Sequence, residues 1–120
     1  LIYADKFHLK NALFNLVENA IKYSTEQAEV YIRTEKVKNK ITFTIRDKGI
    51  GIEKAHLKRI FDKFFRVPKG NLHETKGYGL GLFYVYQIVK KHNTKIHVKS
   101  EVNIGTSFSI AFDKFSNQKE

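Results

Sequence analysis

Apolar residues recur at helical spacing near the start of the chain. Between residues 5 and 24 they stand three or four positions apart, and Asp5 occupies the place of a helix N-cap. The apolar positions are Leu9, Leu13, Leu16, Val17, Ala20 and Ile21. This spacing predicts one long helix with a single apolar face.

Four segments alternate apolar and polar residues, which is typical of strands buried on one face. They cover residues 30–32, 41–45, 95–100 and 107–112, with turn residues at 38–40 and 103–105. Because each pair of segments is separated by a short turn, we expect two antiparallel hairpins.

Two further segments lie between the hairpins. The first is short and amphipathic, and a second helix is expected from about Gly79 to about His92. The apolar stripe of the short segment is Leu57, Ile60, Phe61, Phe64 and Phe65. Residues 66–77 lack periodicity and predict a long connection. This order predicts a two-layer α/β sandwich, a largely antiparallel mixed sheet packed on one side by about three helices, in a single domain over residues 1–120.

Composition narrows the possible classes of protein. A chain of 120 residues that is 42% hydrophobic and 13% aromatic can bury a core, which argues against disorder. The absence of cysteine excludes disulfides, thiol nucleophiles and thiolate zinc sites. The longest apolar stretch, residues 80–89, is too short to span a bilayer. The chain does not begin with Met, and we expect it to be a fragment.

The charge balance is strongly basic. The formal net charge is +10, which favours an anionic partner, and nucleic acid is one candidate. The 22 Lys and Arg residues are scattered along the whole sequence, however, and a solvated basic surface is the commoner reason for such a charge balance. Charge alone leaves both interpretations open.

One stripe of the first predicted helix is polar. Its members are Asn11, Asn15, Glu18, Asn19 and Lys22. Because Asn is a poor helix former, three on one stripe require a reason. One explanation is a solvated face. The other is that the amide oxygens bind a magnesium ion while Lys22 attracts the phosphates of the same ligand.

A glycine-containing loop follows the second predicted strand. In residues 47–52, Gly49 and Gly51 allow a tight turn and close approach to a flat ligand. The carboxylate of Asp47 is able to accept a hydrogen bond from an exocyclic amine. The same pattern also occurs as plain turn chemistry, so the loop alone is ambiguous.

Three alternating glycines precede the second predicted helix. They lie within residues 76–82, where free backbone N–H groups and the helix dipole suit a phosphate. The segment is not a P-loop, which ends in Gly-Lys-Ser/Thr, and it lacks the spacing of a dinucleotide fingerprint. Glycines that only permit close packing are the alternative.

Together these segments carry a family resemblance. Five sequences occur in order: NLVENAIKYS (15–24), DKGIG (47–51), FDKFFR (61–66), GYGLGL (77–82) and GTSF (105–108). The set resembles the ATP-binding catalytic domain of sensor histidine kinases over residues 5–112. The resemblance implies an ATP pocket between sheet and helices, closed by a mobile lid over residues 66–76.

The resemblance also implies roles for individual residues. Asn19 would be the magnesium ligand, Asn15 would lie near the phosphates, and Arg66 would reach towards them. Asp47 would accept a hydrogen bond from the adenine amine, and Thr106 would support the adenine through Asp47 or a bridging water. The full set implied to contact the nucleotide is Asn15, Asn19, Lys22, Tyr23, Asp47, Gly49, Gly51, Ile52, Lys76, Gly77, Tyr78, Gly79, Leu80, Gly81, Leu82 and Thr106. A bulky Tyr78 departs from the family, where small residues are common.

The position of Asn15 distinguishes relatives of the same fold. In DNA gyrase, mismatch-repair ATPases and a heat-shock chaperone, a Glu there activates water, whereas an amide cannot take a proton at neutral pH. Asn15 therefore favours phosphoryl transfer over hydrolysis. Glu18 lies on the same stripe and remains a candidate base, which leaves a related ATPase or serine kinase as the alternative.

The resemblance places the phosphate acceptor outside this chain. Of the five histidines only His73 is followed by an acidic residue, Glu74, and it lies in the expected lid, so the resemblance implies an acceptor histidine on a separate helical dimerisation domain. The partners implied are that domain, the receiver domain of a response regulator, ATP and Mg²⁺, in a homodimeric and membrane-anchored sensor whose catalytic domain is cytoplasmic. A nucleic-acid-binding module ranks below this interpretation, because most phenylalanines occupy core-compatible positions.

Overall fold

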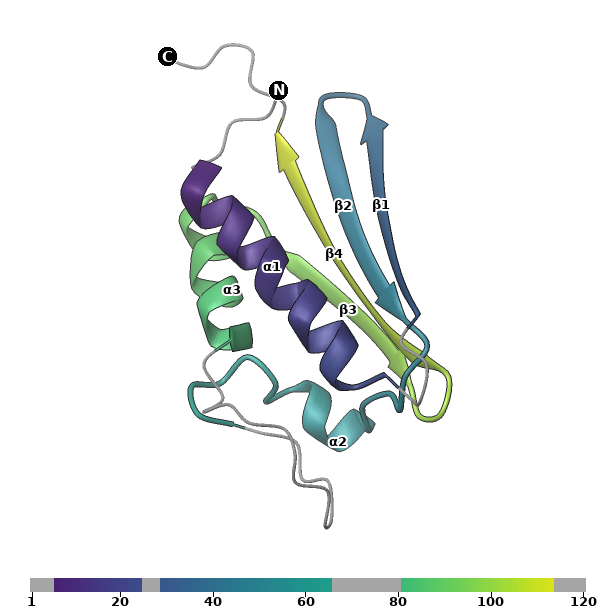
Figure 1. Ribbon diagram of the computed structural model, residues 1–120. Coiled ribbons are helices and arrows are strands. Elements are labelled where there is room, and N and C mark those ends of the chain that lie inside the picture. The colour runs from purple at the N-terminus through teal and green to yellow at the C-terminus, as the bar shows by residue number, and fades with distance from the viewer. Residues whose placement is uncertain (1–5, 25–28, 66–80, 114–120) are drawn as a thin grey trace.

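The computed structural model describes residues 6–24, 29–65 and 81–113, which form helices on one side of a sheet (Figure 1). The elements are α1 (Lys6–Lys22), β1 (Val30–Val37), β2 (Lys40–Asp47), α2 (Lys54–Leu57), α3 (Gly81–Lys91), β3 (Ile96–Glu101) and β4 (Gly105–Asp113). Helices α1 and α3 contact each other and cover the same face of the sheet. The predicted two-layer sandwich is confirmed.

The sheet has the order β1-β2-β4-β3. Every pairing among these four strands is antiparallel, so no parallel pair is found in the described part of the chain, where the sequence suggested a mixed sheet. Both hairpin turns contain a residue with positive φ, Lys38 at 56° and Asn103 at 67°. The end of β2 lies beside the start of β4, because Asp47 of β2 pairs with Thr106 of β4.

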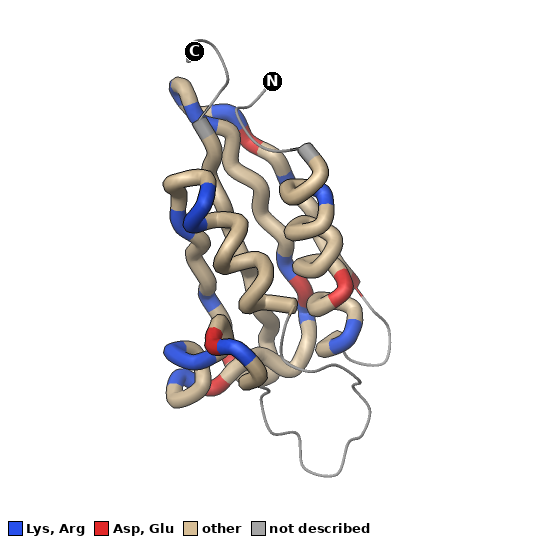
Figure 2. Tube along the Cα trace, turned by 90° about the vertical axis from the view of Figure 1, so that its left-hand side faces the viewer, with Lys and Arg blue, Asp and Glu red and all other residues tan. Residues whose placement is uncertain are grey.

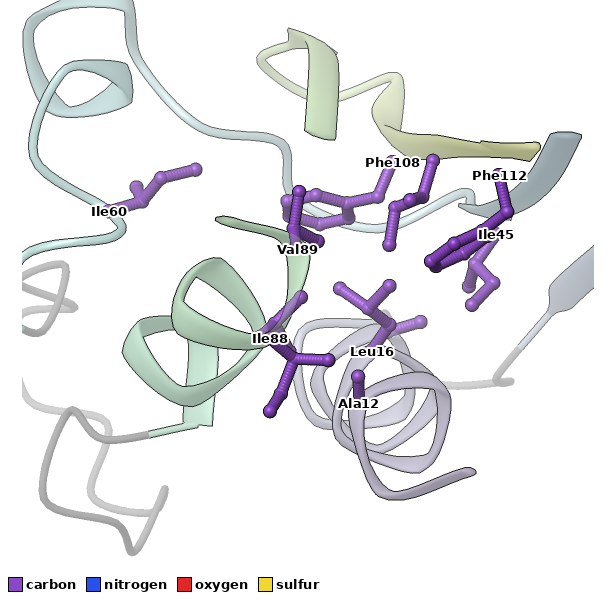
Figure 3. Close-up of a cluster of buried hydrophobic side chains, with 11 residues drawn as sticks. Ala12, Leu16, Ile45, Ile60, Ile88, Val89, Phe108 and Phe112 are labelled. Atoms are coloured by element: carbon purple, nitrogen blue, oxygen red, sulfur yellow. The ribbon is translucent and has the colours of Figure 1, made fainter. Parts of the chain in front are cut away.

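The core lies between the sheet and the two long helices (Figure 3). Strand alternation sends Ile45 of β2 and Phe108 of β4 inward, where both are buried. Leu16 of α1 and Val85 of α3 meet them from the helical layer. Full burial of one such side chain contributes about 1.5–3 kcal/mol, so this apolar contact holds the two layers together.

Three expectations about apolar side chains are wrong. Ile21 was expected on the apolar face of α1 but is 53% exposed. Helix α2 ends at Leu57 and the chain then turns, so the predicted stripe does not continue to Phe64, which is 62% exposed. Ile32 was expected to face the core but is also 62% exposed. The reason is that β1 is an edge strand of which only Val30 packs against the core.

Several other expectations concern residues outside the described ranges. They are the Asp5 cap, the connection over residues 66–77 and the start of the second helix at Gly79. Within the described ranges, no helix is long and apolar enough to cross a membrane. Lys and Arg are spread over both layers rather than confined to one element (Figure 2).

Candidate functional site

The asparagine stripe of α1 faces the start of α3. The side chain of Asn15 is half-buried, and its Nδ2 donates a hydrogen bond of 2.8 Å to the carbonyl oxygen of Asn11. Its Oδ1 points towards α3, because a Cβ built on Gly81 would lie only 3.1 Å from that oxygen. The two helices are also joined by a 3.0 Å hydrogen bond between His8 Nδ1 and Tyr84 Oη. Two segments of the predicted nucleotide site are therefore neighbours.

The other polar residues of the stripe differ in exposure. Asn19 is half-buried like Asn15, whereas Glu18 and Lys22 are exposed. Magnesium is usually held by one or two protein oxygens together with phosphate oxygens. A pair of half-buried amide side chains, one with its oxygen directed at α3, fits that requirement. No group of three or more His, Asp or Glu able to hold a metal occurs in the described part of the chain.

Asp47 forms the second part of the site, at the end of β2. It is only 5% exposed, and its Oδ1 accepts the N–H of Gly49 at 2.8 Å. Burial raises the pKa of Asp47 above the ordinary value of 3.8, while hydrogen bonds from the backbone N–H groups of Gly49 and Thr106 act in the opposite direction. The site therefore presents a buried carboxyl group oriented by two backbone amides.

The loop after β2 is held by segments distant in sequence. The N–H of Ile50 donates to the carbonyl oxygen of Tyr23 at 3.1 Å, and the N–H of Asn103 donates to the carbonyl oxygen of Ile50 at 2.8 Å. These bonds tie the loop to the end of α1 and to the β3–β4 turn. The loop is thus a fixed wall beside Asp47.

Both glycines of this loop are required by their neighbours. A Cβ on Gly49 would lie 2.1 Å from the carbonyl oxygen of Tyr23, and one on Gly51 would lie 2.3 Å from the carbonyl oxygen of Glu101. Gly51 also has φ at +77°, which disfavours other residues. The predicted tight turn is confirmed. Its glycines, however, accommodate backbone from α1 and β3, so they are explained without a ligand.

The sequence interpretation missed Ser100. Its Oγ accepts the N–H of Ile52 at 2.7 Å, lies 2.7 Å from Thr106 Oγ1 and donates to the carbonyl oxygen of Gly105 at 3.1 Å. The available signal was its place in β3, where Ile96 and Val98 mark the inward positions and Ser100 continues them with a polar residue. Ser100 thereby joins the loop of Asp47 to β4.

Other residues of the expected site are distributed as follows. Tyr23 contributes its backbone to the loop, and Ile52 and Leu82 pack against the core while remaining half-buried. Thr106 pairs with Asp47 and is buried. The remaining positions lie outside the described residues: Arg66, Lys76, Gly77, Tyr78, Gly79 and Leu80, together with the expected lid over residues 66–76.

A cavity of about 570 Å³ lies at the same end of the sheet. Arg46, Lys99 and Ser107 line it from three neighbouring strands, at positions that alternate with core residues. These side chains belong to the face away from the helices, so this cavity is not the expected pocket between sheet and helices. Asp47 and Thr106 border it from their strand ends.

Comparison with known proteins agrees with this geometry. The family model described as "Histidine kinase-, DNA gyrase B-, and HSP90-like ATPase" matches residues 4–115. The sensor protein RprX of Bacteroides fragilis is 45% identical over 98% of this chain, and the match covers 23% of RprX. This chain therefore spans about a quarter of the length of that relative.

Solved structures show the same likeness. The mycobacterial sensor histidine kinase MprB has a TM-score of 0.82 at 28% identity, covering 93% of this chain and 76% of that chain. Full-length ShkA, in complex with AMPPNP, has a TM-score of 0.78 at 27% identity, covering 97% of this chain and 24% of that chain. The chain therefore belongs to the histidine kinase-, DNA gyrase B-, and HSP90-like ATPase family, and its resemblance to the ATP-binding catalytic domains of sensor histidine kinases is confirmed.

Proposed function

We propose that this chain binds magnesium-ATP and transfers the γ-phosphate to a histidine on a separate helical dimerisation domain. From there the phosphate passes to the receiver domain of a response regulator. The observation that carries the proposal is that Asn15 lies beside the start of α3. A Cβ built on Gly81 would lie 3.1 Å from Asn15 Oδ1. Amide oxygens beside a glycine-rich helix start suit a phosphate chain with its cation.

The adenine would bind at the opposite end of the site. The carboxylate of Asp47 accepts the exocyclic amine, while Gly49, Gly51 and Ile52 form the wall around the ring. The orienting N–H of Gly49, at 2.8 Å, supports this role because it leaves the carboxylate little freedom to rotate. Thr106, whose N–H also bonds to Asp47, supports the same edge of the base.

The phosphates would lie along α1. Asn19 and Asn15 supply oxygens on this stripe, and Lys22 with Tyr23 follows the nucleotide. Bound magnesium would neutralise phosphate charge in this place. In this proposal Arg66 and the glycines of residues 77–81 would contact the phosphates, and residues 66–76, which lie outside the described residues, would be the lid.

Transfer, rather than hydrolysis, is proposed for the chemical step. Asn15 cannot remove a proton from water, so this chain mainly positions ATP in line with the histidine nucleophile of the other domain. The γ-phosphate forms a bond to the histidine nitrogen as its bond to the β-phosphate oxygen breaks, and ADP leaves. Glu18 is the remaining candidate base, and its exposed position allows contact with the second domain.

The surrounding protein is also part of the proposal. The relatives are sensor proteins several times longer than this chain, which supports a catalytic domain within a longer sensor. We propose that this sensor is homodimeric and membrane-anchored. In that arrangement this domain is cytoplasmic, where ATP is available. The alternative, a related ATPase or serine kinase, is favoured only if Glu18 acts as the base that Asn15 cannot provide.

Reconstitution tests the proposal. The purified chain is incubated with γ-labelled ATP, magnesium and the helical phosphoacceptor domain of the same protein. We expect label on the acceptor histidine, stable to base and labile to acid, and almost no phosphate release by the chain alone. Steady ATP hydrolysis without the acceptor, abolished by Glu18→Gln, would instead establish the ATPase alternative.

A further inference from the structure

The hydroxyl group of Ser100 has three polar neighbours but only one proton. The N–H of Ile52 can only donate, so Ser100 Oγ accepts from it at 2.7 Å. The carbonyl oxygen of Gly105 can only accept, so at 3.1 Å it takes the proton of Ser100. The N–H of Ile52 belongs to the loop and the carbonyl of Gly105 belongs to β4. Because the single proton of Ser100 goes to Gly105, none is left for a third partner.

The third partner is the hydroxyl of Thr106. Its Oγ1 lies 2.7 Å from Ser100 Oγ, and Thr106 is only 6% exposed. Since the proton of Ser100 is taken by Gly105, the proton in this contact comes from Thr106. Thr106 Oγ1 then retains its lone pairs and has no proton to offer, so it can act towards a ligand only as an acceptor.

Because Thr106 can only accept hydrogen bonds from a ligand, it affects which purine base the site binds. Asp47 is paired with Thr106 across the sheet, and its ionised carboxylate is also only an acceptor. Two acceptors side by side match an exocyclic amine, which has two protons to donate. A carbonyl oxygen in the same place, as guanine has, would meet two further acceptors and make no hydrogen bond.

We propose that Ser100 is a specificity-determining residue, which holds the Thr106 hydroxyl in its acceptor orientation and so favours adenine over guanine nucleotides. The proposal rests on the proposed function, since it assumes that a purine binds against Asp47. Ser100 itself does not touch the ligand. It acts through Thr106 and is a positioning residue.

Competition binding of magnesium-ATP and magnesium-GTP to the 120-residue chain tests the proposal. Ser100→Ala frees the Thr106 proton to rotate towards the ligand, so we expect the ratio of ATP to GTP affinity to fall by about tenfold. Ser100→Thr retains the hydroxyl and should keep the ratio. Ser109→Ala is the matched control, because Ser109 forms a similar hydroxyl pair with Thr44, at 3.2 Å, away from Asp47.

The ratio of ATP to GTP affinity distinguishes the proposed role of Ser100 from a purely structural one. Loosening of the loop would weaken ATP and GTP equally and leave their ratio unchanged, which would overturn the proposal. In a Thr106→Val background, Ser100→Ala should no longer alter the ratio, because no Thr106 hydroxyl remains to be oriented. A persistent effect there would also overturn it. Failure of the unmutated chain to bind either nucleotide would contradict the proposed function instead.

Discussion

Replacing Asp47 with Asn tests the adenine end of the site. Asp47 is 5% exposed, and its Oδ1 accepts the N–H of Gly49 at 2.8 Å. An asparagine has one acceptor oxygen, which we expect to remain with the Gly49 amide. Its NH₂ group then faces the adenine amine, so two donors oppose each other where the carboxylate had accepted a hydrogen bond.

The size of the effect follows from the charge of the lost acceptor. A hydrogen bond to a charged group contributes about 1.5–3 kcal/mol, so the affinity for magnesium-ADP should fall by about ten- to a hundredfold. The free energy of unfolding should change little. Burial raises the pKa of Asp47, which means that the ionised carboxylate is unfavourable in the folded chain before any ligand binds.

Isothermal titration calorimetry with magnesium-ADP measures the change, and thermal unfolding followed by circular dichroism checks the fold. Asp62→Asn is the matched control. Asp62 is an exposed aspartate whose Oδ2 lies 3.5 Å from Arg59 Nε, and we expect its loss to leave the affinity unchanged. An affinity of Asp47→Asn within twofold of the unmutated chain, at unchanged thermal stability, would refute the role of this carboxylate.

Further predictions address Asn19, Gly49 and the pH dependence that Asp47 confers. Asn19→Ala should abolish magnesium-dependent ADP binding while helix stability rises by about half a kcal/mol, and calorimetry with and without magnesium checks this. Gly49→Ala should lower the free energy of unfolding by about 1–3 kcal/mol, measured by urea denaturation, because the added Cβ would lie 2.1 Å from the Tyr23 carbonyl oxygen. ADP affinity should weaken as pH falls through the raised pKa of Asp47, and Asp47→Asn should remove that dependence. In the ligand-free chain the same raised pKa acts oppositely: the contribution of Asp47 to stability is fully present below pH 3.8 and is lost as pH rises through the folded-state pKa.

Local patterns in the sequence determined the helices and most strands. Helical spacing from Leu9 to Ala20 needs only the geometry of one helix, and alternation through Ile45 and Phe108 needs only that of one strand. The same regularity made Asn15 and Asn19 visible as one stripe, because a helix repeats its faces whatever packs against it. The positions of Gly49 and Gly51 likewise marked a turn in the chain.

Contacts between distant segments were decided only by the tertiary structure. Ile32 alternates like a core residue yet is exposed, since edge or central position depends on which strands pair. Gly49 is required by the carbonyl of Tyr23, and Ser100 serves the loop at Ile52, a separation of 48 residues for the latter pair. Periodicity reports which face of an element is buried, but hydrogen-bond partners depend on how the elements are brought together. For that reason only the folded chain shows that Asp47 pairs with Thr106 across the sheet and that Ser100 contacts the Thr106 hydroxyl.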